Sequence, residues 1–600
     1  MRLHKGSQAC LLLLVHAIGS VVAVDFAQCL TDIIQNANTT QNLTGLLDGD
    51  GNPVSNASNA TSISYSMCAS QCGTGQEPFQ WAIFSQEFSA WLLPNLALIS
   101  QLPFGAQYRL DNLMSAVLTV GSPALAGYSL FITLLNSRWI KRRFDSSVDY
   151  PNSRFALSIL SSLQQVPLRL HPDPVRLPSL IVLPENDSWW KCLAEFVDYT
   201  HTWSIASATS IAWVIIAYIL TVANSLSNVY ADVQSNGEAT GSMWLWLIPV
   251  VVGWLQLSPK CDFDRLKAAY DRADRHSIHT GPADVHVGRL PASSRRALAI
   301  TAKEEDVMSP DELLTPPVFN YSRSLRWAST AETVFLVFKA ASEKAHSHKP
   351  ICGSDWVEPG TSVSTHEMEC FQCSDSTHDI ETIQYIDDTQ NIDHRNRYGS
   401  PQDVVMYCTP PNETRSSHWA PGVFTRMAIA SCASLGLQWG TVGAAFLVGW
   451  FTPTTKMGCR SIGYLLYGAI STLIWMMLLV SSILAHYSTA DPLRARGVLS
   501  ARSAALKLSH LLRWTGKLLA IINFFLAIMA CVFQYSSFYD RCYCNSSVFS
   551  RHGAAYAVII ETAAQAAQAK TAWVVALVLA CTSATAFLAL LNLLLDTLPS

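Results

Sequence analysis

Cys370 and Cys373 form a CxxC pair with His366 before it and His378 after it, a spacing that fits a zinc site, a disulfide or a loop without chemistry. Structural zinc sites usually join a CxxC to a second CxxC or to an HxxxH. Here only single residues at irregular spacings are available as further ligands. The weak metal candidates are Cys370, Cys373, His366 and Cys408. We expect free thiols and no bound metal or cofactor.

Motifs for catalysis are missing from the sequence. The stretch HEMEC departs from the HExxH pattern of metalloproteases, because Cys370 stands where the second histidine ligand belongs. We also find no phosphate-binding P-loop, no nucleophile elbow and no pair of carboxylates within an apolar stretch. The chain is therefore not predicted to be an enzyme.

Composition indicates a membrane protein. Half of the 600 residues are apolar and 14% are charged, whereas soluble proteins average about 25%. A net charge of -4 and a pI near 6.5 exclude the basic surface that nucleic-acid binding requires. The expected partners are the lipid bilayer and other proteins.

The N-terminal region carries export signals. Residues 1–23 combine Arg2 and Lys5, a following apolar run and small residues at the end, as in a signal peptide. Residues 24–87 are rich in Asn, Ser and Thr, which predicts a mostly irregular, glycosylated arm outside the cell. The predicted glycosylation sites are Asn38, Asn42, Asn56, Asn59 and Asn545. The candidates for disulfides are Cys29, Cys68, Cys72, Cys459, Cys542 and Cys544.

Apolar runs near the length that a bilayer requires predict an all-α membrane protein. A first group, residues 112–258, contains predicted spans at 112–136, 203–226 and 242–257, with a loop at 137–202. A second group, residues 427–596, contains spans at 427–450, 461–485, 518–534 and 572–595. An eighth run, residues 88–104, is interrupted by Pro94, Asn95 and Gln101. It predicts a further span, a re-entrant segment or an interfacial one.

Seven spans and eight spans place the large loop, residues 259–426, on opposite sides of the membrane. With seven, basic stretches such as RWIKRR lie in the cytosol, as the positive-inside bias requires. Sequons at Asn186, Asn320 and Asn412 favour eight, whereas the sequon at Asn545 favours seven. We predict seven spans, with the N-terminus outside and the C-terminus in the cytosol. The plasma membrane is the expected location.

The large loop is predicted to be partly helical. The run FDRLKAAYDRADRH places Phe263, Leu266, Tyr270 and Ala273 on one face, as in an amphipathic helix beside an anionic membrane. A second predicted helix, ASTAETVFLVFKAASEKAH, covers residues 328–346. In the cytosol Cys370 and Cys373 would stay reduced.

The predicted spans contain no ionisable residue in their interiors, whereas ion-coupled carriers usually keep such groups there. They do contain Gln438 and Asn523. Gly436 and Gly440 form a small-xxx-small pattern at which helices could pack closely. Pro123, which follows Gly121 and Ser122 within a span, predicts a kink.

Several stretches, among them LISQLPFGAQYRLDNLMSAVLTVGSPALAGYSL, PPVFNYSRSLRW and LQWGTVGAAFLVGWFTPTTKMGCRSIGYLLYGAISTLIWMML, resemble a group of filamentous-fungal multispanning membrane proteins. The resemblance implies a membrane protein and no particular activity. The leading hypothesis is therefore a receptor-like or scaffolding protein that binds an unknown partner through residues 259–426. The alternative is a channel or facilitator for an uncharged solute.

Overall fold

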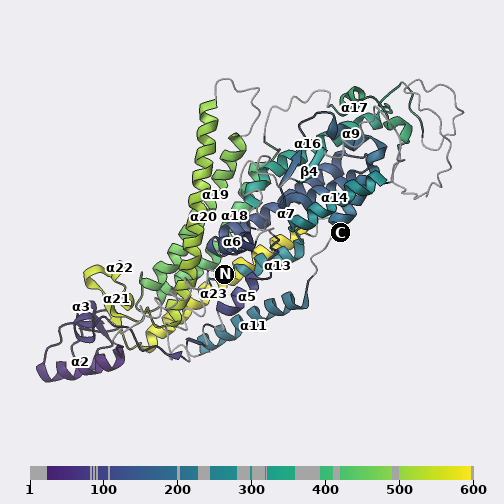
Figure 1. Ribbon diagram of the computed structural model, residues 1–600. Helices are drawn as coiled ribbons and strands as arrows, with labels where there is room; N and C mark the ends of the chain where they lie inside the picture. Colours follow the sequence, from purple (N-terminus) through teal and green to yellow (C-terminus); the bar gives the residue numbers. More distant parts are fainter. Residues whose placement is uncertain are drawn as a thin grey trace, which may run out of the picture.

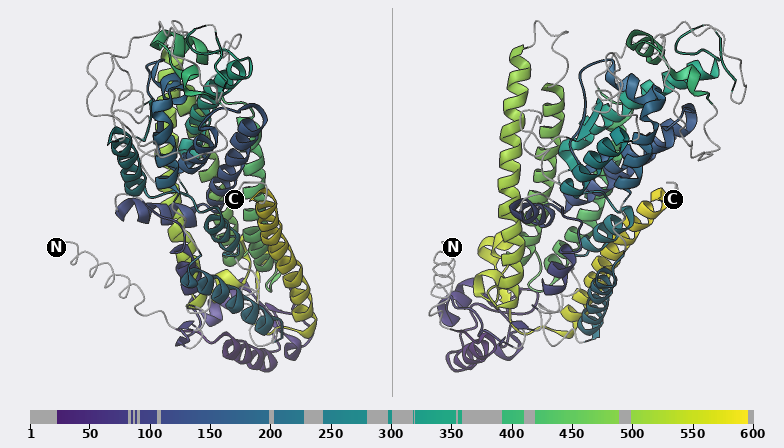
Figure 2. Two further views of the ribbon diagram at one scale, coloured as in Figure 1. Left: turned by 90° about the vertical axis from the view of Figure 1, so that its right-hand side faces the viewer. Right: turned by 45° about the vertical axis from the view of Figure 1, so that its right-hand side comes forward.

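The computed structural model describes residues 23–595, except for 82–83, 86–87, 89–91, 106–108, 199–202, 228–242, 280–296, 301–317, 319, 354, 359–391, 410–418 and 489–498. The CxxC motif, Asn412 and nearly all of the predicted signal peptide therefore lie outside the described residues. The described chain is elongated, with a bundle of long helices between two differently built ends (Figures 1 and 2). We call the end around α2 and α21 the cap, and the end around α9, α14 and α17 the base.

The cap joins the N-terminal region to the connection between α20 and α23. Its N-terminal elements are α2 (Phe26–Thr40), β1 (Leu46–Leu47), η1 (Ala57–Asn59), β2 (Ser62–Ser64), α3 (Tyr65–Met67) and η2 (Cys68–Cys72). Its later elements are α21 (Cys542–Asn545), α22 (Val548–Arg551), η11 (His552–Ala554) and β5 (Tyr556–Val558). The strands form one antiparallel sheet in the order β1-β2-β5, in which Ile63 pairs with both Leu46 and Ala557.

The N-terminal arm is therefore not mostly irregular, as the sequence had suggested. Asp25 accepts a hydrogen bond from the backbone N–H of Gln28 and caps α2, whose Leu30 and Ile33 are buried in a small core with Ile63. The prediction failed because it considered only the apolar residues of the N-terminal segment itself. Part of this core comes from residues about 500 positions later in the chain, namely β5 and Cys542.

The bundle is built from α5 (Leu93–Ile99), α6 (Arg109–Gly121), α7 (Pro123–Ser147), α11 (Ile205–Ser227), α13 (Leu247–Leu257), α18 (Val423–Phe451), α19 (Cys459–Ser488), α20 (Leu499–Tyr535) and α23 (Ala563–Leu595). Among the described residues, five helices are long and apolar enough to cross a membrane: α11, α18, α19, α20 and α23. A sixth results if α6 and α7 are counted as one bent span. The predicted count of seven or eight spans is not confirmed, because α13 is short and the described part of residues 88–104 contains the short helix α5.

The predicted span at 112–136, for which Pro123 predicted a kink, is divided into two helices at that residue. α6 ends at Gly121 and α7 begins at Pro123, and the two helices are bent by 105°. Pro123 has no N–H to donate and suits the first position of a helix, and the Ser122 hydroxyl caps α7 by accepting from Leu125 N. A local sequence signal for the break was thus present, although it indicated only a kink.

The base contains α8 (Ser153–Ser162), η4 (Leu163–Gln165), β3 (Leu168–Leu170), α9 (Arg176–Val182), η5 (Pro184–Asn186), α10 (Asp187–Val197), α14 (Phe263–His279), β4 (Leu298–Ile300), α16 (Asn320–His346), η9 (His394–Arg397) and α17 (Pro401–Cys408). Strands β3 and β4 pair antiparallel. The predicted loop at 137–202 is mostly helical, and both helices predicted within 259–426 are present.

The apolar face of α14 does not lie on a membrane. Phe263, Leu266 and Ala273 are buried within the base, where Tyr270 packs its ring edge-on against Trp189 of α10. Trp189 Nε1 also donates to Asp274, at 2.8 Å. The amphipathic pattern was read correctly as a helix, but its apolar face is covered by protein.

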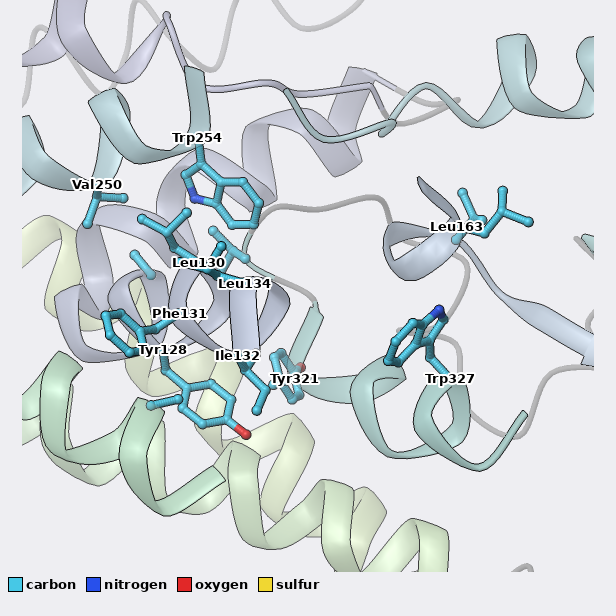
Figure 3. Close-up of a cluster of buried hydrophobic side chains, with 14 of the residues drawn as sticks. Tyr128, Leu130, Phe131, Ile132, Leu134, Leu163, Val250, Trp254, Tyr321 and Trp327 are labelled. Atoms are coloured by element: carbon cyan, nitrogen blue, oxygen red, sulfur yellow. The ribbon is translucent and has the colours of Figure 1, made fainter. Parts of the chain in front are cut away.

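Residues 259–426 are not a separable loop, because their described parts complete the core of the base. The Arg397 guanidinium binds both carboxylate oxygens of Asp187 in α10, at 2.7 and 2.6 Å. Figure 3 shows Tyr128 and Leu134 of α7, Trp254 of α13 and Trp327 of α16 among the side chains of this continuous apolar core. The base and the bundle therefore share one core.

Candidate functional site

The most informative site is the break between α6 and α7, where the two helix ends face α18, α19 and α20. A helix end leaves backbone N–H and C=O groups without partners inside the helix. In an apolar environment each such group costs several kcal/mol unless another group bonds to it. The side chains that bond to these groups decide whether the break can bind a ligand.

The N-terminus of α7 is bonded by α18. Gln438 Oε1 accepts from the backbone N–H of Ala124, at 3.0 Å. The backbone oxygen of Ser122 accepts from Ala126 N at 3.1 Å, and the Ser122 hydroxyl donates to Ser471 O in α19, also at 3.1 Å. The N–H groups that could have bound an anion at this helix end are therefore already engaged.

The C-terminus of α6 is bonded by α19 and α20. The Tyr467 hydroxyl donates to Val120 O at 2.7 Å, and Asn523 Nδ2 donates to Gly121 O at the same distance. Asn523 Nδ2 also donates to the backbone oxygen of Tyr467, at 3.1 Å. The last two carbonyl groups of α6, those of Val120 and Gly121, thus already accept hydrogen bonds.

Gln438 connects the two halves of the site. Its Nε2 donates to Gly468 O and to Thr472 Oγ1, both at 2.9 Å, while the Ser471 hydroxyl donates to its Oε1. Gln438, Ser471 and Asn523 are fully buried. We call Ser122, Gln438, Tyr467, Ser471 and Asn523, with the helix ends they bind, the polar joint.

Close packing fixes the position of the polar joint. A Cβ atom on Gly121 would lie 2.3 Å from Ala520 O, so only glycine allows α6 to end against α20. The two glycines of the predicted packing face of α18 differ in their surroundings. Gly440 is buried against Ser583 of α23, whereas a Cβ on Gly436 would have no atom within 4 Å.

The polar joint is suited to holding helices together and not to catalysis. It contains no acid, base or thiol, and its members donate to or accept from protein groups. The Asn523 Oδ1 atom has no donor within hydrogen-bond distance among the described residues. The sequence had singled out Gln438 and Asn523, but not Tyr467 and Ser471, whose residue types are ordinary in a membrane helix.

The residues predicted to bind metal do not form a site in the described part of the chain. His366, Cys370 and Cys373 lie outside it. Cys408 is buried at the end of α17, and this burial raises the pKa of its thiol. Within the described residues, no group of three or more His, Cys, Asp or Glu side chains could hold a metal ion.

The six predicted disulfide candidates pair with one another in the cap. The bonds are Cys29–Cys72, Cys68–Cys542 and Cys459–Cys544. The first lies within the N-terminal segment, the second ties that segment to the connection between α20 and α23, and the third ties that connection to the start of α19. The disulfides of the cap therefore join chain segments that are far apart in the sequence.

The sequons divide between the two ends. Asn38, Asn42, Asn56 and Asn59 are exposed on the cap, and Asn545, also in the cap, is half-buried and accepts from Arg460 Nη1 at 3.0 Å. Asn186 and Asn320, in the base, are buried.

Comparison of the chain with protein families, with curated proteins and with solved structures gives no match.

Proposed function

We propose that this protein is a receptor-like or scaffolding membrane protein that binds a protein partner through the base, within residues 259–426. The observation that carries this proposal is the polar joint. A transporter built on a broken helix leaves helix ends available to its substrate. Here these ends bond to Gln438, Tyr467 and Asn523. A closed, tightly hydrogen-bonded bundle is better suited to connecting two ends than to passing a solute.

The proposed orientation places the cap outside the cell and the base in the cytosol, at the plasma membrane. The three disulfides support this, because such bonds persist in oxidising compartments. The run Arg138, Lys141, Arg142 and Arg143 at the base end of α7 agrees with the positive-inside bias. Glycans on the exposed cap sequons are part of the same proposal.

The base offers a surface for a partner that lipid does not cover under this orientation. Tyr398 and Met406, beside and within α17, expose 47% and 64% of their surface in the aqueous part of the molecule. Tyr398 lies six residues after position 392, where the described chain resumes, and Met406 lies in the following helix, α17. We therefore assign partner binding to this region, together with residues 359–391.

Removal of all of 259–426 would delete α14, α16 and α17, so the test is confined to residues 362–390. Val357 N donates to Asn396 Oδ1 at 3.0 Å, and Asn396 Nδ2 donates to Val357 O at 2.7 Å. The described residues on the two sides of this segment are thus joined by hydrogen bonds. A short Gly/Ser linker in place of residues 362–390 should leave the base folded.

The test is in-cell cross-linking and purification of the full chain, the excised variant and a Tyr398→Ser/Met406→Asp variant. A matched control replaces residues 490–497, between the end of α19 at Ser488 and the start of α20 at Leu499. We expect one partner to be recovered with the full chain and the control, and lost with one of the other two variants. Equal recovery with all four proteins would contradict the proposal.

Liposome swelling assays test the alternative of a facilitator. We expect vesicles containing the full chain to take up neutral solutes no faster than empty vesicles. Uptake that disappears in Gln438→Leu would instead favour a facilitator that uses the polar joint.

A further inference from the structure

The position of the α6–α7 break relative to the membrane follows from α19 and α20, which run between the cap and the base. α20 reaches the cap at Tyr535, where Arg460 donates to Gln534 and pairs with Asp540. Lys517 lies 18 residues earlier in this helix, which is about 27 Å at 1.5 Å per residue. That distance is close to the thickness of the bilayer core, about 30 Å.

The tip of the pair lies within this distance, nearer its base end than its cap end. Ser122 donates to the backbone oxygen of Ser471, which is 12 residues, or about 18 Å, from the start of α19 at Cys459. Gly121 packs directly against Ala520. Ala520 is three residues, about 4.5 Å, on the cap side of Lys517, so the tip lies inside the apolar part of α20 and close to its base end.

From this tip, α7 leads to the base. Arg143 pairs with Glu332 of α16. Just after the end of α7, Asp149 N donates to the Ser342 hydroxyl of the same helix, at 2.9 Å. One end of the pair is thus fixed in the base.

The other end also lies on the base side. Gly105 O accepts from Phe263 N at 3.5 Å, and a Cβ on Gly105 would lie 2.9 Å from the Cα of Asp262. Phe263 begins α14, an element of the base. Asp111, in the first turn of α6, lies within electrostatic reach of Lys517, at the base end of the apolar part of α20. A single bent span would instead have placed Arg109 and Asp111 next to the cap.

We propose that α6 and α7 form a re-entrant pair that enters the bilayer from the base side, turns at Ser122 and Pro123, and returns to the base side. The N-terminal crossing then lies between Glu77 of the cap, whose backbone N donates to Asp540 O at 3.1 Å, and Gly105 at the base, with α5 on its path. The sidedness of all later segments is unchanged, because one crossing replaces another.

The re-entrant pair creates a surface for lipid in the leaflet on the base side. Leu110 and Leu113 of α6 expose 71% and 60% of their surface. In a membrane such side chains contact acyl chains, while Arg109 reaches the headgroups. The inference does not depend on the proposed function, since it concerns only which end of the molecule each segment meets.

Paired cysteines in full-length protein in native membranes test the proposal. The Asp111→Cys/Lys517→Cys pair should cross-link with a short bis-maleimide, whereas the matched Asp111→Cys/Tyr535→Cys pair should not. The parent chain measures the background from its native thiols. The opposite pattern, or no cross-link in the first pair, would overturn the re-entrant arrangement.

Labelling with a membrane-impermeant maleimide gives a second readout. Arg109→Cys should react from the same side as Arg142→Cys in the base, and not from the side of Ser66→Cys in the cap. Reaction of Arg109→Cys together with Ser66→Cys would show a bent span that crosses the membrane. If Arg109→Cys reacts from neither side, the cross-linking result decides between the two arrangements.

Discussion

Gln438 illustrates what a single residue contributes to this bundle. Its amide oxygen accepts from Ala124 N and from the Ser471 hydroxyl, and its nitrogen donates to Gly468 O and Thr472 Oγ1. These contacts engage both the acceptor and the donor atom of the amide, so both form hydrogen bonds within the protein. From the sequence, an uncharged amide in an apolar helix indicated only a helix contact. The partner N–H of Ala124, 314 positions away, could not be inferred from spacing.

The first prediction is that Gln438→Leu lowers the thermal stability of the purified protein. Leucine has nearly the same volume but leaves Ala124 N–H and the Ser471 hydroxyl buried without their partner. Each such group costs about 1–3 kcal/mol. Thermal unfolding in detergent measures the effect. Thr425→Val, at an exposed position of the same helix, is the control and should unfold like the parent. Equal stability of both variants would mean that the polar joint does not hold the helices together.

At the scale of elements, the sequence predicted helices better than it predicted their surroundings. The periodicity of FDRLKAAYDRADRH and ASTAETVFLVFKAASEKAH correctly placed α14 and α16. The same pattern could not show that α14 packs against α10 instead of lipid, because an apolar face fits either environment. The break at Pro123 was underestimated for a similar reason. Hydropathy records the length of an apolar run, but not whether the chain turns back within it.

In the cap, disulfides and residues from distant parts of the chain compensate for the low number of apolar residues in the N-terminal segment. Its sheet and small core depend on β5, which follows β2 by nearly the whole chain. Cys68–Cys542, with a sequence separation of 474 residues, joins the same two regions. We therefore regard this disulfide as the main attachment of the N-terminal segment to the bundle. Cys29–Cys72 closes a loop within that segment alone.

The second prediction is that a Cys68→Ser/Cys542→Ser variant keeps its bundle but loosens its cap. Loss of a native disulfide typically costs about 2–5 kcal/mol in a small domain. Limited proteolysis should cleave residues 24–76 of this variant faster than those of the parent. Cys29→Ser/Cys72→Ser is the matched comparison and should leave the N-terminal segment attached through Cys68. Identical cleavage of parent and Cys68→Ser/Cys542→Ser protein would contradict this role of the bond.

At the scale of the whole molecule, the two ends differ in the chemistry that each side of a membrane permits. The cap holds the three disulfides and the exposed sequons. The base holds free thiols such as Cys408 and the buried ion pair of Asp187 with Arg397. Composition and cysteine positions already predicted a membrane protein with an exported end. The sequence alone could not show that residues 137–202 and 259–426 fold together, because their contacts join positions up to about 200 residues apart.

Burial in the base does not itself prevent glycosylation, because the transferase acts on the chain before it has folded. Asn186 and Asn320 would therefore receive glycans if the base were lumenal, and the bulky sugars would then prevent their burial. Occupancy of these sequons reports the side of the membrane and not the accessibility of the folded protein. This makes them suitable for testing the orientation on which the proposed function rests.

The most direct measurement is glycosylation mapping with one sequon retained at a time in the full-length chain. We expect glycans on Asn38, Asn42, Asn56 and Asn59 of the cap, and none on Asn186 or Asn320 of the base. Each result is read as a mobility shift that a glycosidase reverses, with a chain lacking all sequons as the control. A glycan on Asn186 or Asn320 would place the base in the lumen and contradict a cytosolic partner-binding end.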